Sequence, residues 1–171
     1  DMTTAIDATT TVLNAYGDAA DDVTKIHDIM VKTQDKGKIT VDQLGQNMGR
    51  VIPAASSLGV NLDQLGTAYS MLTAKGQNPQ IATTNLNALF NELGKTGSNV
   101  DKVLRKKTGK SFKELTNEGT NVGEVLDVVK TEAEASGQSL SDMFGSMNAG
   151  NAALTLLREG TEGYNALLKE M

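Results

Sequence analysis

Ile39-Thr40-Val41-Asp42-Gln43-Leu44-Gly45 returns 21 positions later as Val60-Asn61-Leu62-Asp63-Gln64-Leu65-Gly66, and this repeated stretch decides the fold. Each copy offers an N-cap side chain, Thr40 or Asn61, followed three residues later by a glutamine that can reach back to the cap. An apolar residue before each cap and another at the fourth helical position have the spacing of a hydrophobic staple. The chain is therefore expected to build helices from a repeated start and to stack them.

The composition favours closely packed helices. The 171 residues fit one domain with a sizeable core. Apolar residues make up 39% but aromatic residues only 4%, so the core is expected to be aliphatic rather than that of a β-sandwich. The net charge of −5 argues against a broad nucleic-acid surface.

Several classes of site and segment are excluded by residue type. The chain has no cysteine, so disulfides, thiolate catalysis and cysteine-based zinc sites are ruled out. No apolar run is long enough to cross a bilayer, and no signal peptide is visible. Because the chain begins with Asp1, we expect it to be a piece of a longer polypeptide.

Glycine recurs at helix length and marks where helices end. A glycine just past a helix accepts the left-handed conformation at no steric cost, which is the role expected of Gly17, Gly37, Gly59, Gly76, Gly97, Gly109, Gly119 and Gly137. Apolar residues between these stops recur at steps of three and four, as in amphipathic helices. Helices are predicted over 3–16, 19–35, 41–58, 62–75, 79–94, 99–107, 112–117, 122–136, 140–145 and 149–170.

The predicted fold class is all-α, an irregular bundle or array of about eight to ten short helices. Further caps are expected at Asn78, before a proline at the first helical position, and at Ser111, which opens a capping box. Weaker capping boxes are expected at Asn121 and Ser139. Pro53 removes a backbone donor within the third helix, so a kink or break is expected there. A break is also conceivable near 95–121, where charge and glycine concentrate.

Candidate metal and catalytic residues are few. His27 is the single histidine, and it follows the apolar position Ile26, so it is expected to flank a buried face rather than to act as a base or ligand. Asp18, Asp21 and Asp22 crowd a helix start, where the helix dipole already accounts for them, and the EF-hand pattern is absent. No catalytic, cofactor-binding or metal-binding residue is therefore assigned, and no cofactor is expected.

A basic cluster stands out in the acidic chain. It comprises Lys102, Arg105, Lys106, Lys107, Lys110 and Lys113. Such a cluster could contact the phosphates of a nucleic acid, but basic residues near a helix C-terminus also complement the dipole. Phe112 is the only aromatic residue there that could stack on a base. The sequence favours the dipole role, with nucleic-acid contact through Lys102, Arg105, Lys106 and Lys107 as the alternative.

Gly45-x-x-x-Gly49 followed by Ala54-Ala55 permits two helices to cross closely. In a membrane this spacing indicates helix dimerisation, but the segment is too polar for that. The sequence therefore favours close packing inside the domain over a subunit interface.

Several ordered motifs resemble the core region of tailed-phage tape measure proteins, from about residue 1 to 95. They are Leu13 to Gly17, Gly37 to Gly45 leading to Gly49-Arg50-Val51, Ala54 to Leu65, Leu72 to Gly76, and Ala82 to Thr84. None of them is a catalytic signature. With this resemblance, residues 1–97 are assigned to a tape-measure-like helical core and residues 98–171 to a helical continuation of the same domain.

The resemblance implies a structural role without catalysis, in phage or prophage tail assembly and tail-length determination. Implied partners are the tail tube protein, tail assembly chaperones and other copies of the same protein. The implied location is the virion tail, and the host cytoplasm during assembly.

The alternative is a helical cell-wall hydrolase or a DNA-entry module of a virion protein. A hydrolase would need a glutamate acid in a cleft, for which Glu92, Glu114, Glu118 and Glu124 qualify by residue type alone. The DNA-entry module would depend on the basic cluster.

Overall fold

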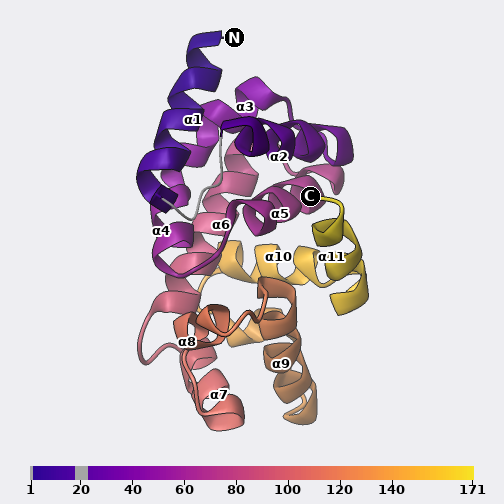
Figure 1. Ribbon diagram of the computed structural model, residues 1–171. Helices are drawn as coiled ribbons and strands as arrows, with labels where there is room; N and C mark the ends of the chain where they lie inside the picture. Colours follow the sequence, from indigo (N-terminus) through magenta and orange to yellow (C-terminus); the bar gives the residue numbers. More distant parts are fainter. Residues whose placement is uncertain (1, 18–22) are drawn as a thin grey trace.

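The computed structural model describes residues 2–17 and 23–171, and within these ranges the chain is helical without strands. Figure 1 shows short helices joined by brief turns. The α-helices are α1 (Met2–Tyr16), α2 (Val23–Lys36), α3 (Val41–Asn47), α4 (Ile52–Ser57), α5 (Leu62–Ala74), α6 (Pro79–Gly94), α7 (Asn99–Thr108), α8 (Phe112–Asn117), α9 (Val122–Ala135), α10 (Met147–Leu156) and α11 (Gly160–Lys169). Two 3-10 turns, η2 (Met48–Arg50) and η3 (Ser141–Met143), complete the described elements. The all-α prediction is confirmed.

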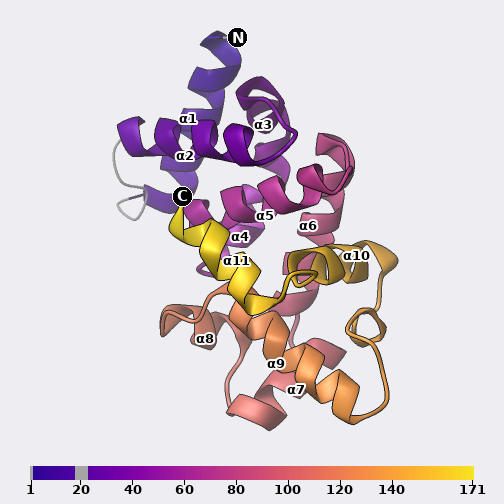
Figure 2. The same ribbon diagram turned by 90° about the vertical axis from the view of Figure 1, so that its right-hand side faces the viewer.

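The helices lie in two groups at opposite ends of the molecule, and the C-terminal helices pack back against both groups. Helices α1 to α5 lie at one end and α7 to α9 at the other, with the long α6 running between them (Figures 1 and 2). Helix α10 then returns to pack along α6, and α11 packs on α9 and α5. One cluster of buried apolar side chains extends through all of these elements. The C-terminal helices therefore close the fold against helices that precede them by many positions.

Capping explains most helix starts. Both reciprocal hydrogen bonds of a capping box form at Thr40, Ser111 and Asn121, and the Asn78 side chain accepts from the Ile81 N–H at 2.8 Å. Ser139 exchanges the same pair of bonds with Asp142 before η3. These interactions satisfy backbone donors that the first helical turn leaves free.

The prediction for the second copy of the repeated start is wrong in one respect. Asn61 makes no side-chain cap hydrogen bond, although α5 begins at Leu62 as expected. Gln64 does not reach back to the cap, because its side-chain oxygen accepts from the Val122 N–H of α9 at 2.8 Å. The apolar residues of both staples, Ile39, Leu44, Val60 and Leu65, are buried.

The expected break at Pro53 is confirmed. Helix α3 ends at Asn47, η2 follows, and α4 begins at Ile52 with the proline in its first turn, where its missing N–H costs nothing. In the segment 95–121, α7 and α8 pack on α6 and α9.

Two other boundaries differ from prediction. The single helix expected over 149–170 is two helices, because Gly160 takes a left-handed φ of 72° and separates α10 from α11. The helix expected over 140–145 is reduced to the 3-10 turn η3. The second helix was predicted to start at residue 19, but residues 18–22 lie outside the described part of the chain. Within the described part, α2 begins at Val23.

Glycine has two roles, ending helices and letting helices approach closely, and the second role was not predicted for Gly37. Seven of the eight glycines predicted to end helices have positive φ, but Gly37 does not. Instead, a Cβ on Gly37 would lie 2.6 Å from Thr73 Oγ1 and 2.8 Å from the Ser70 Cα, while one on Gly66 would lie 2.5 Å from Thr33 Oγ1. Helices α2 and α5 therefore cross with their backbones in close approach. The Ser70 hydroxyl donates to the Thr33 carbonyl at 3.0 Å within this crossing.

The close crossing predicted for Gly45 is confirmed inside the domain. A Cβ on Gly45 would lie 2.8 Å from Thr4 Cγ2, so α3 meets α1 there. Gly49 has no neighbour within 4 Å of such a Cβ and takes no part in the crossing.

Candidate functional site

Gln64 is the polar centre of the contact between α5, α9 and α11. Its side-chain oxygen accepts from the Val122 N–H at 2.8 Å and from the Tyr164 hydroxyl at 3.4 Å. All three residues are buried. The bond to Val122 satisfies a free donor at the start of α9, in addition to the local cap at Asn121. Sequence reasoning missed this role, because a glutamine at the third helical position also fits a local capping box.

The Tyr164 ring lies directly against the backbone of Gly123. A Cβ on Gly123 would lie 2.5 Å from Cδ1 of the ring, which a real side chain could not do without displacement. Burial, and then the negative charge of Asp63, raise the pKa of the Tyr164 hydroxyl well above its usual range. The hydroxyl therefore stays protonated and serves as a hydrogen-bond donor rather than as an acid or base.

His27 is exposed on α2 beside buried Ile26, as predicted for a residue that flanks the apolar face. Within residues 2–17 and 23–171, no cluster of three or more histidine, aspartate or glutamate side chains has the geometry to hold a metal ion. Asp18, Asp21 and Asp22, the other acidic candidates, lie outside the described residues.

The basic cluster is largely neutralised by ion pairs. Arg105 Nε lies 3.0 Å from Oδ1 of the buried Asp101, one turn earlier on α7. Lys106 and Lys107 both reach Glu132 of α9, at 3.3 and 2.8 Å. Hydrogen bonds from Lys107 and Lys106 lower the pKa of that carboxyl below its usual range.

Lys110 pairs with Glu118 in the same cluster. Among the described residues, this leaves Lys102 and Lys113 as the members without an ion pair. Four of the six cations are thus occupied in joining α7 to α9 and in securing the ends of α7 and α8. The cluster offers little free positive charge to a polyanion.

The four glutamates considered as general acids each have a structural partner. Glu92 accepts from the Gly145 N–H, Glu118 pairs with Lys110, and Glu114 and Glu124 complete capping boxes. Hydrogen bonds from Ser111 lower the pKa of the Glu114 carboxyl. A general acid at neutral pH needs a raised pKa and a position in a cleft, so the environment of Glu114 is the opposite of what that chemistry requires.

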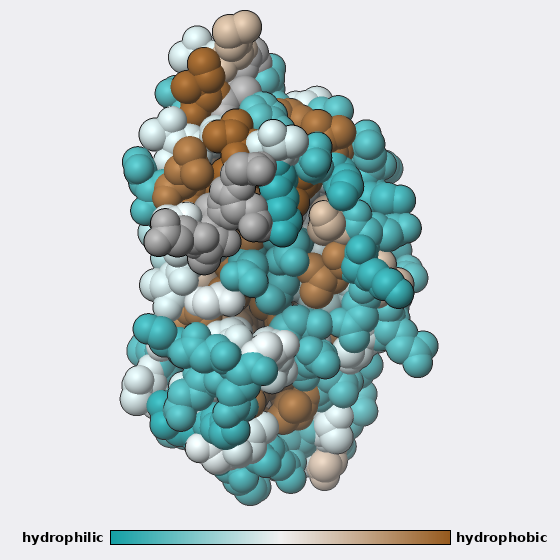
Figure 3. All heavy atoms as spheres, viewed as in Figure 1, coloured by the Kyte–Doolittle hydropathy of each residue, from teal (hydrophilic) through white to brown (hydrophobic). Residues whose placement is uncertain are grey.

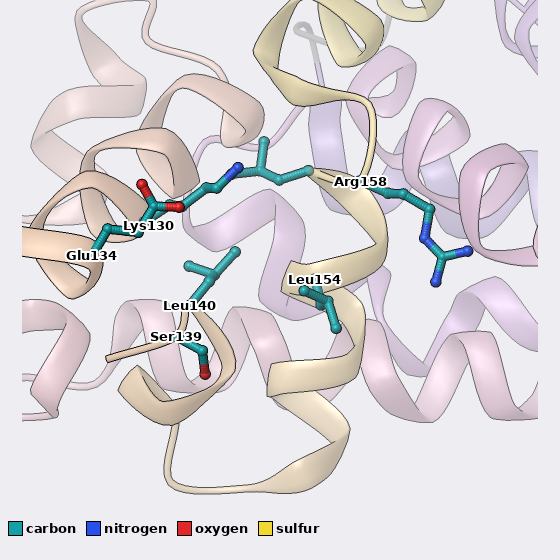
Figure 4. Close-up of a pocket in the computed structure, with 7 residues that line it drawn as sticks. Lys130, Glu134, Ser139, Leu140, Leu154 and Arg158 are labelled. Atoms are coloured by element: carbon teal, nitrogen blue, oxygen red, sulfur yellow. The ribbon is translucent and has the colours of Figure 1, made fainter. Parts of the chain in front are cut away.

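The surface is hollowed by shallow grooves. One, of about 370 Å³, lies between the end of α9, the η3 turn and the end of α10. Leu140 and Leu154 are among the residues that line it, and in Figure 4 the Arg158 guanidinium points away from the other labelled side chains. A second groove of about 280 Å³ lies along the contact between α5 and α11, and Met71 and Leu167 are among the residues that line it. Neither groove brings together a nucleophile, a base and an orienting group.

Exposed apolar side chains gather at the N-terminal end. Met2, Ile6 and Leu13 are exposed on α1, and Val23 and Val31 on α2. Figure 3 shows brown patches over these two helices, whereas the lower end of the molecule is mostly hydrophilic. Apolar patches of this kind commonly mark contacts with other proteins.

The fold and its surfaces thus define an all-α protein with capped helices, close helix crossings and surface ion pairs. The profile of the phage-related minor tail protein family matches residues 1–159. The chain belongs to this family of minor tail proteins.

The chain is also similar to a probable tape measure protein of Clostridium phage phiCD119. The two are 41% identical over 177 residues, which cover all of this chain and 19% of that protein. This chain therefore spans about a fifth of the length of its relative. No solved structure matches the chain. Within the described residues, no helix is both long enough and apolar enough to cross a membrane.

Proposed function

We propose that the chain is a folded module of a phage tail tape measure protein and acts in tail assembly and tail-length determination. The observation that carries this proposal is its likeness, over its whole length, to a probable tape measure protein. Membership in the minor tail protein family agrees with it. The proposed location is the virion tail, preceded by the host cytoplasm during assembly.

The module acts through binding rather than through catalysis. Each of the four candidate glutamates already has a structural partner, a backbone N–H for Glu92, a salt bridge for Glu118 and a capping box for Glu114 and Glu124, which supports this part of the proposal. The proposed partners are the tail tube protein, tail assembly chaperones and further copies of the same protein. A peptidoglycan clearing assay tests the hydrolase alternative: clearing that is lost when Glu92 or Glu114 becomes Gln would contradict a purely structural role.

Residues 1–97 and 98–171 are proposed to form one domain. The packing of α10 along α6 and of α11 on α5 supports this, since the C-terminal segment would leave a large apolar surface uncovered if it folded separately.

Deletion of the module tests the length role and also reports its state inside the tail. Extended as a continuous helix, 171 residues would span about 260 Å. Folded, the module has a radius of gyration of about 15–16 Å and would account for roughly 40 Å. In-frame deletion should therefore shorten the tail by about 260 Å if the module is extended within the tube, and by much less if it stays folded. Tail length is measured by electron microscopy of purified virions.

A replacement variant is the control for the deletion. An unrelated helical segment of equal length should restore the tail length if the module serves as a measure, and should fail to do so if specific contacts are needed for assembly. Unchanged tail length after deletion would overturn the length role.

A further inference from the structure

Helix α11 has little of its own to keep it folded. It begins at Gly160, has no side-chain cap and carries a second glycine, Gly163, in its interior. Glycine in a helix is about 1 kcal/mol less favourable than alanine. Ten-residue helices are unstable in water without tertiary contacts, so α11 depends on what it touches.

The contacts of α11 with the core are few: Leu168 packs against the core only partly buried, and Asn165 accepts a hydrogen bond from Asn121 Nδ2 at 2.6 Å. Tyr164 is its single buried residue, seated on Gly123 with its hydroxyl directed to Gln64. Thr161 Oγ1 is buried without a hydrogen-bond partner among the described residues, which weakens the docking further. The groove of about 280 Å³ between α11 and α5 leaves part of the interface open.

Ion pairs at the surface hold both ends of α11. Lys75 of α5 lies 3.2 Å from Glu159, immediately before the helix, and Lys36 of α2 lies 3.3 Å from Glu170, immediately after it. Both pairs are well exposed to solvent, so salt screens them. Helix α11 thus spans the groove with one fully buried apolar anchor, Tyr164, and an ion pair at each end. Just beyond the helix, Lys32 donates a hydrogen bond to the Met171 carbonyl at 3.3 Å.

We propose that α11 is a strap that opens reversibly while the remaining helices stay folded, and that the Lys36–Glu170 and Lys75–Glu159 pairs set how often it opens. Opening withdraws Tyr164 from Gly123 and uncovers the start of α9 together with Met71 in the groove. The other C-terminal helix, α10, is not part of the strap, because it packs along α6 and buries six of its residues. This inference concerns the order in which the module opens and does not depend on its role in the tail.

Native-state hydrogen exchange on the full chain tests the strap. In the wild-type protein, amides of Tyr164 to Lys169 should exchange at least tenfold faster than those of the α6 interior, Leu86 to Phe90. Replacing both Lys36 and Lys75 by Gln should speed exchange in α11 by a further 2- to 30-fold and leave α6 unchanged, since an exposed pair is worth about 0.2–1 kcal/mol. Raising NaCl from 0.05 to 1 M should have the same effect in the wild type and little effect in the double variant.

The control is Lys106→Gln with Lys107→Gln, which likewise removes two lysine–glutamate ion pairs, here between α7 and Glu132 of α9, and changes no residue of α11. Exchange in α11 should not respond to it. The proposal is overturned if α11 and α6 exchange at the same rate in the wild type, or if the Lys36 and Lys75 variant affects α11 no more than the control does.

Discussion

Gly123 lies so close beneath the ring of Tyr164 that a single methyl group on the glycine would approach Cδ1 to 2.5 Å. The two residues are 41 positions apart in sequence, in α9 and α11, and each is buried. The glycine therefore provides the flat backbone surface on which the aromatic ring packs. This contact joins the C-terminal helix to the rest of the fold.

We expect Gly123→Ala to destabilise the protein by about 1–3 kcal/mol, because the added methyl group displaces the Tyr164 ring. This loss outweighs the better helix propensity of alanine, about 1 kcal/mol. Urea unfolding followed by far-UV circular dichroism measures it. Gly49→Ala is the matched control, since a Cβ there has no neighbour within 4 Å, and its cost should be near zero.

A double-mutant cycle isolates the contact. In a Tyr164→Leu background, Gly123→Ala should cost less than in the wild type, because a smaller, flexible side chain can move aside. Equal costs in both backgrounds would show that the ring is not what excludes a side chain at Gly123.

The two glutamines of the repeated start should differ in their effect on stability. Gln64→Ala leaves the buried Val122 N–H and the Tyr164 hydroxyl without an acceptor, so we expect a loss of about 1–3 kcal/mol. Gln43→Ala removes only the exposed bond to the Thr40 N–H and should cost about 0.5–1 kcal/mol. Thermal or urea unfolding compares them. A Gln43→Ala cost equal to or above that of Gln64→Ala would contradict the assigned roles.

Local chemistry in the sequence was enough to predict most helix boundaries. A cap such as Ser111 with Glu114, or a left-handed glycine such as Gly109, acts within one turn, so it can be recognised from neighbouring residues alone. The apolar residues with staple spacing, recognised in the same local way, are buried in both copies. The recurrence of apolar residues at steps of three and four likewise predicted an all-α protein correctly.

Roles that depend on distant partners were not predictable in this way. Gly37 and Gly123 are required by neighbours on other helices, and unlike Gly45 they lie in no local spacing pattern that indicates a close helix approach. Gln64 had a plausible local partner and a distant actual one, at the start of α9. The pairing of Lys106 and Lys107 with Glu132 also required the fold, and it changes what the basic cluster can do.

Alkaline pH should destabilise the protein through its three tyrosines. Burial raises the pKa of Tyr69 to about 12 and raises that of Tyr16 and Tyr164 beyond the usual range, while unfolded tyrosine titrates near pH 10. Because the pKa of each tyrosine is higher in the folded protein than in the unfolded chain, the stability that the tyrosines contribute is complete below about pH 10. This stability is lost as the pH rises through the folded-state pKa. Each tyrosine should then reduce the unfolding free energy by about 1.4 kcal/mol per pH unit.

Absorbance at about 295 nm, where phenolate absorbs, measures this without interference from tryptophan, which the chain lacks. The folded protein should show little phenolate at pH 11, and all three tyrosines should ionise near pH 10 in urea. Phenolate that forms near pH 10 without loss of helical circular dichroism would mean that the tyrosines are accessible in the folded state.

The basic cluster should not retain DNA at physiological salt. Arg105, Lys106, Lys107 and Lys110 each already face a carboxylate, so binding a phosphate would require breaking an ion pair for each new contact. Counterion release from so few free cations gives little affinity near 150 mM salt. Gel-shift titrations with duplex and single-stranded DNA measure this.

Glu132→Gln is the informative variant, because it frees Lys106 and Lys107 and should strengthen any weak binding at low salt. Wild-type binding that persists at 150 mM salt, and disappears when Lys102, Arg105, Lys106 and Lys107 become Ala, would instead establish the cluster as a nucleic-acid contact.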